Sequence, residues 1–174
     1  MDKYGHKLSA GERPRIRPDK EPLDFLFEIA GLITVVAMVV LAAIKYPGLP
    51  QTIPTHFNGS GLPDDYSGKG MIWLLPGISV VLFAGISILN YFPFTFNFPV
   101  NITAENAERL YRHATRSMRV MNLMLVILFF YLTWQTIATA AGGSTGLGLW
   151  FVPVTVVAIL GYSLYMIIRM YRLK

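Results

Sequence analysis

The sequence predicts an all-α integral membrane protein, a four-transmembrane-helix bundle with one extracytoplasmic Pro/Gly-rich loop and one cytoplasmic amphipathic helix. Hydrophobic residues make up 53% of the 174 residues and charged residues 14%, whereas soluble proteins contain about 25% charged residues. Long uncharged runs recur along the chain, and about 20 apolar residues in a helix cross the hydrocarbon core. We place the spans at about residues 25–44, 71–92, 120–141 and 147–168.

Residues 1–24 precede the first span and are polar. Lysines and arginines alternate there with acidic residues, and Pro14, Pro18 and Pro22 interrupt the segment. We therefore expect a disordered cytoplasmic arm over residues 1–24, followed by a membrane domain over residues 25–174. Only Tyr4 supplies an aromatic ring, so the arm lacks the interleaved basic and aromatic pattern of nucleic-acid binding, and we expect no nucleic-acid partner.

The first span contains one charge, Glu28, in its first turn. It is too long for the apolar core of a signal peptide and is followed by Lys45 and Tyr46 rather than by small residues, so we expect it to remain in the mature protein. The second span is uncharged throughout. Pro76 and Gly77 near its beginning predict a kink or a late helix start.

The connection between the second and third spans predicts an amphipathic helix over residues 103–118. Thr103 is the expected N-cap, and apolar side chains from Ala107 onward recur with helical spacing. Glu108 and Arg112 form an i,i+4 pair in the favourable order, as do Glu105 and Arg109. We expect this helix to lie at the cytoplasmic interface and to run into the third span.

The distribution of basic residues predicts the orientation. Thirteen of the 15 lysines and arginines fall in the N-terminal arm, the second connection and the C-terminal end, which four spans place on one side. Lys45 and Lys69 alone fall on the other side. Because cationic residues accumulate on the cytoplasmic side of short loops, both termini are expected in the cytoplasm. The predicted location is the bacterial cytoplasmic (inner) membrane.

Residues 45–70 form the predicted extracytoplasmic loop. Four prolines and five glycines in this stretch exclude a continuous helix. We expect Asp64 and Lys69 to pair across a turn. The stretch also contains the most diverse polar side chains outside the arm, and we expect these to bind a ligand above an apolar floor. The candidate ligand-binding residues are His56, Asn58, Asp64 and Lys69, and the floor residues are Phe57, Tyr66 and Trp73.

Catalytic and metal-binding patterns are weak. His56 with Asp64 and Asp65 supplies one imidazole and two carboxylates, fewer ligands than zinc or calcium sites use, and the other histidines are predicted on the opposite side. The zinc-hydrolase, serine-hydrolase and nucleotide-binding motifs do not occur. We therefore expect no catalytic residues, no metal and no cofactor. The centres of the spans contain no charge, which argues against an ion-coupled transporter.

A resemblance to a known family rests on the same stretch. The matching residues are Tyr46-Pro47, Leu49-Pro50, Ile53-Pro54-Thr55-His56-Phe57-Asn58, Gly61, Pro63-Asp64, Ser67 and Lys69, with Glu105-Asn106-Ala107, Arg109 and Tyr111 after the second span. This pattern resembles the domain of unknown function 1648 family of bacterial membrane proteins. A related domain forms the first part of the immunity proteins that protect cells from the sporulation-delay toxin. The resemblance implies an uncharacterised inner-membrane protein and supplies no catalytic residues.

These observations favour a protein that binds or senses a ligand at its extracytoplasmic loop, in the manner of an immunity or signalling protein. The ligand would be a peptide, a toxin or a lipid. The alternatives are a structural subunit of a membrane assembly, or a metal-dependent membrane hydrolase. Besides the lipid bilayer, the expected partners are a peptide or protein at the outer face, and a second copy of the chain in a homo-oligomer.

Overall fold

The computed structural model describes residues 13–174 and confirms four long apolar helices. They are α1 (Pro22–Lys45), α2 (Leu74–Leu89), α3 (Ala107–Ala140) and α4 (Phe151–Arg172). Each is long and apolar enough to cross a membrane, α2 together with the 3₁₀ turn Lys69–Trp73 that leads into it. The protein is therefore a multi-pass membrane protein. The helix ends differ by a few residues from the predicted spans, as at α1, which begins at a proline whose fixed φ suits a first helical position.

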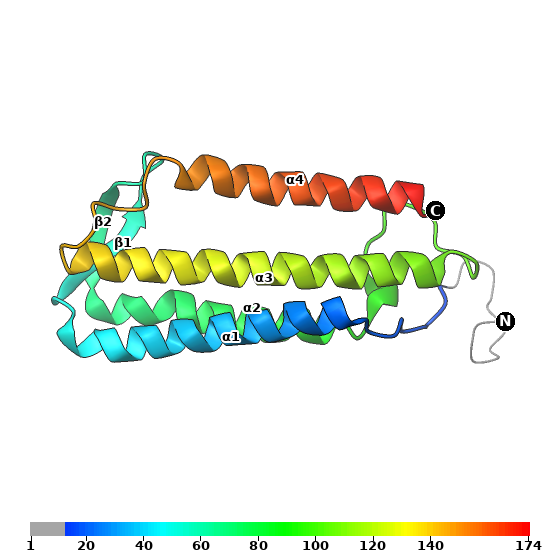
Figure 1. The fold of residues 1–174 in the computed structure, drawn as a ribbon, viewed down its shortest axis with the longest axis horizontal. Helices are drawn as coiled ribbons and strands as arrows, with labels where there is room; N and C mark the ends of the chain where they lie inside the picture. Colours follow the sequence, from blue (N-terminus) through cyan, green and yellow to red (C-terminus); the bar gives the residue numbers. More distant parts are fainter. Residues whose placement is uncertain (1–12) are drawn as a thin grey trace.

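Helix α3 is the centre of the bundle. Figure 1 shows α3 between α4 on one side and the pair α1 and α2 on the other. Helices α1 and α2 pack against α3 and against each other, whereas α3 is the main contact of α4. The 34 residues of α3 make a helix of about 51 Å, which exceeds a hydrocarbon core of about 30 Å.

The predicted amphipathic helix forms the first turns of α3 and continues into the third span without a break. Thr103, the expected N-cap, lies four residues before the helix, and Asn106 is the N-cap instead. Thr103 fixes the turn that leads into α3, because its Oγ1 accepts a hydrogen bond from the Asn106 N–H at 3.3 Å and the Asn106 Oδ1 accepts one from the Thr103 N–H at 2.8 Å. The helical conformation begins at Ala107. The apolar face predicted to rest on the membrane surface is buried within the protein, where Leu110 and Tyr111 contact the segment that precedes α1.

The Pro/Gly-rich stretch contains a β-hairpin that the sequence did not predict. Strand β1 (Thr52–Phe57) pairs antiparallel with β2 (Pro63–Gly68), in a register that sets Thr52 opposite Gly68. Excluding a helix was therefore correct, but describing the stretch as a loop was incomplete. The hairpin tolerates Pro54 because a two-stranded sheet has only edge strands, in which one side of each backbone makes no ladder hydrogen bonds.

The described part of the N-terminal arm is extended and packed. Ile16 is 7% exposed, and Arg13 Nη1 donates a hydrogen bond to the Phe96 carbonyl at 2.6 Å. Arg17 lies over the rings of Tyr91 and Phe92, each 5.3 Å away. The expected disorder therefore does not hold for residues 13–21, because their basic side chains stack on aromatic rings of the second connection. Residues 22–24 of the expected arm belong to α1, and residues 1–12 lie outside the described residues.

The beginning of α1 and the end of α4 lie at one end of the bundle, and the hairpin lies at the opposite end (Figure 1). We call these the terminal end and the hairpin end. Among residues 13–174, only Lys45 and Lys69 of the lysines and arginines belong to the hairpin end. The bundle is thus strongly asymmetric in charge.

Candidate functional site

An apolar cavity lies beneath the hairpin. Its volume is about 320 Å³, and its walls come from β1, the beginnings of α2 and α4, and the last third of α3. Its lining includes Ile53, Phe57, Leu75, Thr133, Leu147 and Phe151. Among residues 13–174, no Asp, Glu, Lys or Arg side chain lines it, and His56 is the one ionisable side chain that does.

Close glycine packing holds the hairpin tip onto the connection between α3 and α4. The Leu147 N–H donates a hydrogen bond to the Gly61 carbonyl at 2.7 Å. Gly61 has a φ of +77°, and a Cβ at this position would lie 2.7 Å from the Gly148 carbonyl oxygen. Both the backbone conformation and the close approach require glycine here. The contact links two segments more than eighty residues apart and holds Leu147, which lines the cavity, against the hairpin tip.

A second set of contacts holds the beginning of α4 against α3. The rings of Tyr131 and Phe151 stack with centroids 5.0 Å apart and planes 16° apart. Tyr131 donates a hydrogen bond from its hydroxyl to the Leu147 carbonyl at 2.9 Å, and the Gln135 side-chain amide donates to the same hydroxyl at 2.8 Å. This part of the cavity wall is therefore fixed by specific polar contacts.

Two of the predicted ligand-binding residues come together at the rim of the cavity. His56 Nδ1 lies 2.5 Å from Asp64 Oδ1, across the two strands of the hairpin. The two side chains are 66% and 42% exposed, so solvent screens their attraction. Because His56 also lines the cavity, the pair provides a hydrogen-bonding and chargeable group at the edge of an apolar space.

The other two predicted residues have local structural roles. Asn58 Oδ1 accepts hydrogen bonds from the backbone N–H groups of Ser60 at 2.9 Å and Leu62 at 3.2 Å, which fixes the hairpin turn. The predicted pairing of Asp64 with Lys69 is wrong. Lys69 follows the second strand at the base of the hairpin, where its Nζ lies 5.0 Å from the centroid of the Tyr46 ring, whereas Asp64 lies near the tip.

The predicted apolar floor is only partly correct. Phe57 lines the cavity. Tyr66 is 54% exposed, and Trp73 packs against Tyr46 with ring centroids 6.0 Å apart. Helices α3 and α4 supply the apolar surface expected from these two side chains. Over residues 13–174, no group of three or more His, Cys, Asp or Glu residues is arranged to hold a metal ion.

The structure adds three threonines to this site, Thr55, Thr133 and Thr136, which all line the cavity. Thr133 on α3 is 1% exposed and lines the cavity. Its Oγ1 has no hydrogen-bond partner within the part of the chain that the structure describes. In the sequence Thr133 is one hydroxyl within an apolar run, and nothing distinguishes it from threonines that face other helices. Only the position of the hairpin and α4 reveals that it faces a cavity.

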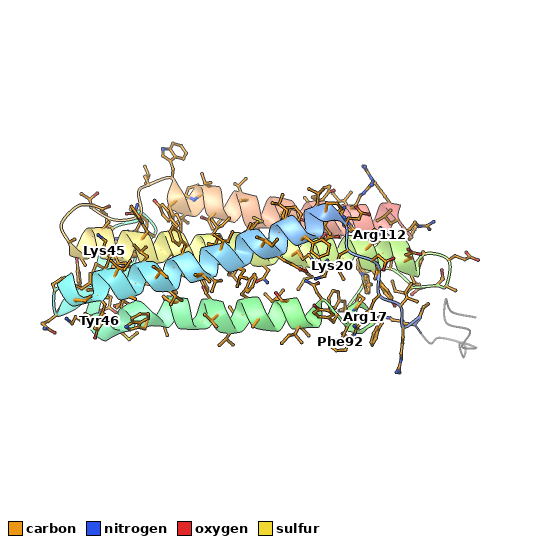
Figure 2. All side chains as sticks on the ribbon, turned by 60° about the horizontal axis from the view of Figure 1, so that its bottom comes forward. Arg17, Lys20, Lys45, Tyr46, Phe92 and Arg112 are labelled. Carbon is orange, nitrogen blue, oxygen red and sulfur yellow. The ribbon has the colours of Figure 1, made fainter. Side chains whose placement is uncertain are left out.

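An ion-pair cluster ties α1 to α3 at the terminal end. Arg116 contacts Glu21 at 2.6 Å and Asp24 at 3.0 Å, and Arg119 contacts Glu28 at 2.7 Å. The side chains of Asp24 and Arg119 are only 3% and 7% exposed. Figure 2 shows the terminal-end residues Arg17, Lys20, Phe92 and Arg112 far from Lys45 and Tyr46 at the hairpin end.

The arginines of this cluster also perturb Glu21, which precedes α1. Hydrogen bonds from Arg116 and then from Arg112 hold the pKa of Glu21 below its ordinary value, since both stabilise the ionised carboxylate. The arginines of α3 in this cluster are paired with acidic side chains at the beginning of α1. The cluster serves to position helices, which leaves the cavity as the candidate binding site.

Comparisons with known proteins find a family model that matches the hairpin and its flanking segments. Residues 33–80 match the family described as "Domain of unknown function (DUF1648)", which confirms the predicted resemblance. An uncharacterized protein of Archaeoglobus fulgidus is 31% identical over 64 residues, which make up 37% of this chain and 35% of that relative. No solved structure matches the chain. The family segment runs from α1 through both strands into α2, and thus includes the roof of the cavity and part of its wall.

Proposed function

We propose that this chain, which carries a domain of unknown function 1648 over residues 33–80, binds or senses a ligand at its hairpin end. The observation that carries the proposal is the apolar cavity beneath the hairpin, with the His56–Asp64 pair at its rim. A mainly apolar pocket with a few convergent polar groups is the usual form of a small-molecule site. The ligand's apolar part would occupy the cavity, and its polar part would meet the pair.

The charge asymmetry supports an orientation for this site. The basic residues of the terminal end suit the cytoplasmic face, where short segments accumulate lysine and arginine. The hairpin end would then face outward, in a bacterial inner membrane with both termini in the cytoplasm. A ligand site at that end is suited to substances that reach the cell from outside, which fits an immunity-like or signalling-like role.

Thermal unfolding in detergent tests the proposal. The wild type and the double variant His56→Ala/Asp64→Ala are compared with three added probes: 1-monolauroylglycerol, an apolar synthetic peptide and Zn²⁺. A ligand that binds only the folded protein adds about 2.7 kcal/mol of stability at 100 times its dissociation constant. We expect one of the two organic probes to stabilise the wild type and to stabilise the double variant much less.

Two results would contradict the proposal. If no probe stabilises the wild type and the double variant is merely less stable, the hairpin is a structural lid, and a subunit of a membrane assembly becomes the better account. If Zn²⁺ alone stabilises the wild type and this effect disappears in the double variant, the metal-dependent hydrolase becomes the better account. Replacing Lys69 with Met is the matched control, because its contact with Tyr46 lies away from the cavity lining.

A further inference from the structure

We infer that the ligand is a neutral lipid of the outer leaflet, whose acyl chain fills the cavity and whose carbonyl or hydroxyl group bonds to Thr133 Oγ1. This inference rests on the proposed function and narrows it from three ligand classes to one. Three features of the cavity support it: the exposed apolar residues on its α2 side, its apolar volume, and the buried, unpartnered hydroxyl of Thr133 on its wall.

Exposed apolar residues border the cavity on the side of α2. At the hairpin end, β1 and Leu147 line it, and Leu147 is held to the hairpin tip by the hydrogen bond to the Gly61 carbonyl. At the side, α2 and α4 both border the cavity, but α4 packs chiefly against α3. Met71 and Leu74 line this side and are 43% and 49% exposed. In a membrane those exposed surfaces face acyl chains, so a lipid can enter without displacing the hairpin.

The volume and lining suit an acyl chain. A space of about 320 Å³ equals the liquid volume of about ten water molecules, at roughly 30 Å³ each. Water in a cavity needs two to four polar partners, and large apolar cavities stay dry or take up apolar molecules. This lining offers few polar atoms, so an apolar chain is the occupant that stabilises the cavity best.

Among the buried hydroxyls without a hydrogen-bond partner in the described residues, which include Ser117 and Thr139 on the same helix, Thr133 is the one that lines the cavity. Other hydroxyls of the bundle are satisfied by their own helix. Thr34 Oγ1 donates to the Ala30 carbonyl at 2.8 Å, and Ser163 Oγ donates to the Ile159 carbonyl at 2.7 Å. Such bonds to the preceding turn are the usual way to satisfy a hydroxyl in an apolar helix. Thr133 makes no such bond, although it is almost completely buried. Leaving a buried hydroxyl unpaired is costly, so a ligand atom is the natural partner.

The position of Thr133 also limits the chemistry of that partner. Thr133 lies seven residues before the end of α3, which places it about 10 Å below the hairpin end of the helix. Because no Asp, Glu, Lys or Arg lines the cavity, nothing there would offset an ionised group at this depth. The partner must therefore be neutral, as an ester carbonyl or a hydroxyl is. A charged headgroup would have to remain at the His56–Asp64 rim.

Photo-crosslinking tests the inference. The protein is reconstituted into phosphatidylcholine vesicles with a monoacylglycerol whose acyl chain carries a diazirine, and adducts are mapped by mass spectrometry. We expect adducts near Leu132 and Thr136, and unlabelled 1-monolauroylglycerol should compete for them. Thr136→Trp, which fills the cavity, should lower these adducts more than tenfold. Adducts near Val157, which is 71% exposed on α4, should not change, because this surface contacts lipid in both proteins.

Thr133→Val tests the hydrogen bond separately. The substitution keeps the shape of the side chain and removes an unpaired hydroxyl, so the ligand-free protein should be as stable as the wild type or slightly more stable. The concentration of 1-monolauroylglycerol needed to displace the diazirine-labelled lipid should rise by roughly 2- to 10-fold, the effect of losing one hydrogen bond. Unchanged competition would overturn the role of Thr133.

The outcomes separate this inference from the broader proposal. Equal cavity adducts in the wild type and Thr136→Trp would overturn the lipid assignment. If, in addition, the apolar peptide stabilises the wild type but not His56→Ala/Asp64→Ala, the binding function remains and the ligand is a peptide. If neither lipid nor peptide binds, both the inference and the proposed function fail.

Discussion

The contact between the hairpin tip and the α3–α4 connection can be tested by adding one methyl group. Gly61→Ala places a side chain on a backbone with a φ of +77°, where the new Cβ would lie 2.7 Å from the Gly148 carbonyl oxygen. The left-handed conformation costs an L-residue about 1–2 kcal/mol. Relieving the close contact requires the hairpin to move from Leu147, which loses a backbone hydrogen bond with a net value of about 1 kcal/mol.

These two effects together predict that Gly61→Ala destabilises the docked hairpin by about 2–3 kcal/mol. The assay is amide hydrogen exchange of Leu147 in lipid nanodiscs. Its N–H exchanges when the hairpin leaves the connection, so this loss of stability should accelerate its exchange by roughly 30- to 150-fold. Exchange within the middle of α3 should not change, because the substitution acts on local opening.

Gly59→Ala is the matched control. Gly59 lies in the same turn, has no atom within 4 Å of a Cβ placed on it and does not have a positive φ. We expect its Leu147 exchange to match the wild type. Equal exchange in Gly61→Ala and Gly59→Ala would refute the reasoning, because the close approach to Gly148 would then not hold the hairpin in place.

Three further predictions concern the ends of the bundle. Arg119→Met should lower the free energy of unfolding in detergent by about 1.5–3 kcal/mol, because Glu28 loses its contact at 2.7 Å and the buried Asp24 loses a cation at 3.7 Å while keeping Arg116. Arg109→Met, on an exposed side chain, should have little effect. The pKa of Glu21 is lowered in the folded protein, so its ionised form stabilises the fold fully above the ordinary pKa of 4.5, and this stabilisation is lost as the pH falls through the lowered pKa. Glu21→Gln should therefore reduce the fall in melting temperature at acid pH. An unchanged dependence of melting temperature on pH would contradict this assignment. Asn58→Ala should destabilise the hairpin by about 1–2 kcal/mol, as its carbonyl oxygen accepts two backbone hydrogen bonds, and Asn58→Asp should retain most of the stability in the same melting experiment.

The spans could be predicted from the sequence because length and hydropathy are local properties. The apolar run at residues 25–44 is by itself long enough to indicate a membrane-spanning helix, and the structure has α1 there. The charge pairs were less predictable. Glu108 and Arg112 share a helix and do form an ion pair, at 3.0 Å, whereas Arg116 finds its partners at Glu21 and Asp24, more than ninety residues away at the beginning of α1. Sequence spacing carries no information about such a distant contact.

The hairpin was missed for a similar reason. Its strands include Pro54, Asp64 and Asp65, which are poor strand formers. Their pairing is supported by the contact of Gly61 with the distant α3–α4 connection, which no local pattern encodes. Proline and glycine content correctly excluded a helix, but it could not distinguish a docked hairpin from a loop.

The sequence indicated where the candidate site lies better than it indicated which residues line it. His56 and Asp64 do lie together, because they occupy opposite strands of one hairpin. The apolar surface beneath them comes from α3 and α4 rather than from Tyr66 and Trp73. Thr133 joins the site only through the packing of elements distant in sequence.

Native mass spectrometry of the protein purified from its own membrane tests the central claim most directly. Three forms are compared: the wild type, Thr136→Trp, which fills the cavity, and Val157→Trp, which adds the same bulk to an exposed surface of α4. We expect the wild type and Val157→Trp to retain one bound molecule of the same mass, and Thr136→Trp to lack it. The same bound mass in all three forms, or none in the wild type, would contradict a ligand site beneath the hairpin.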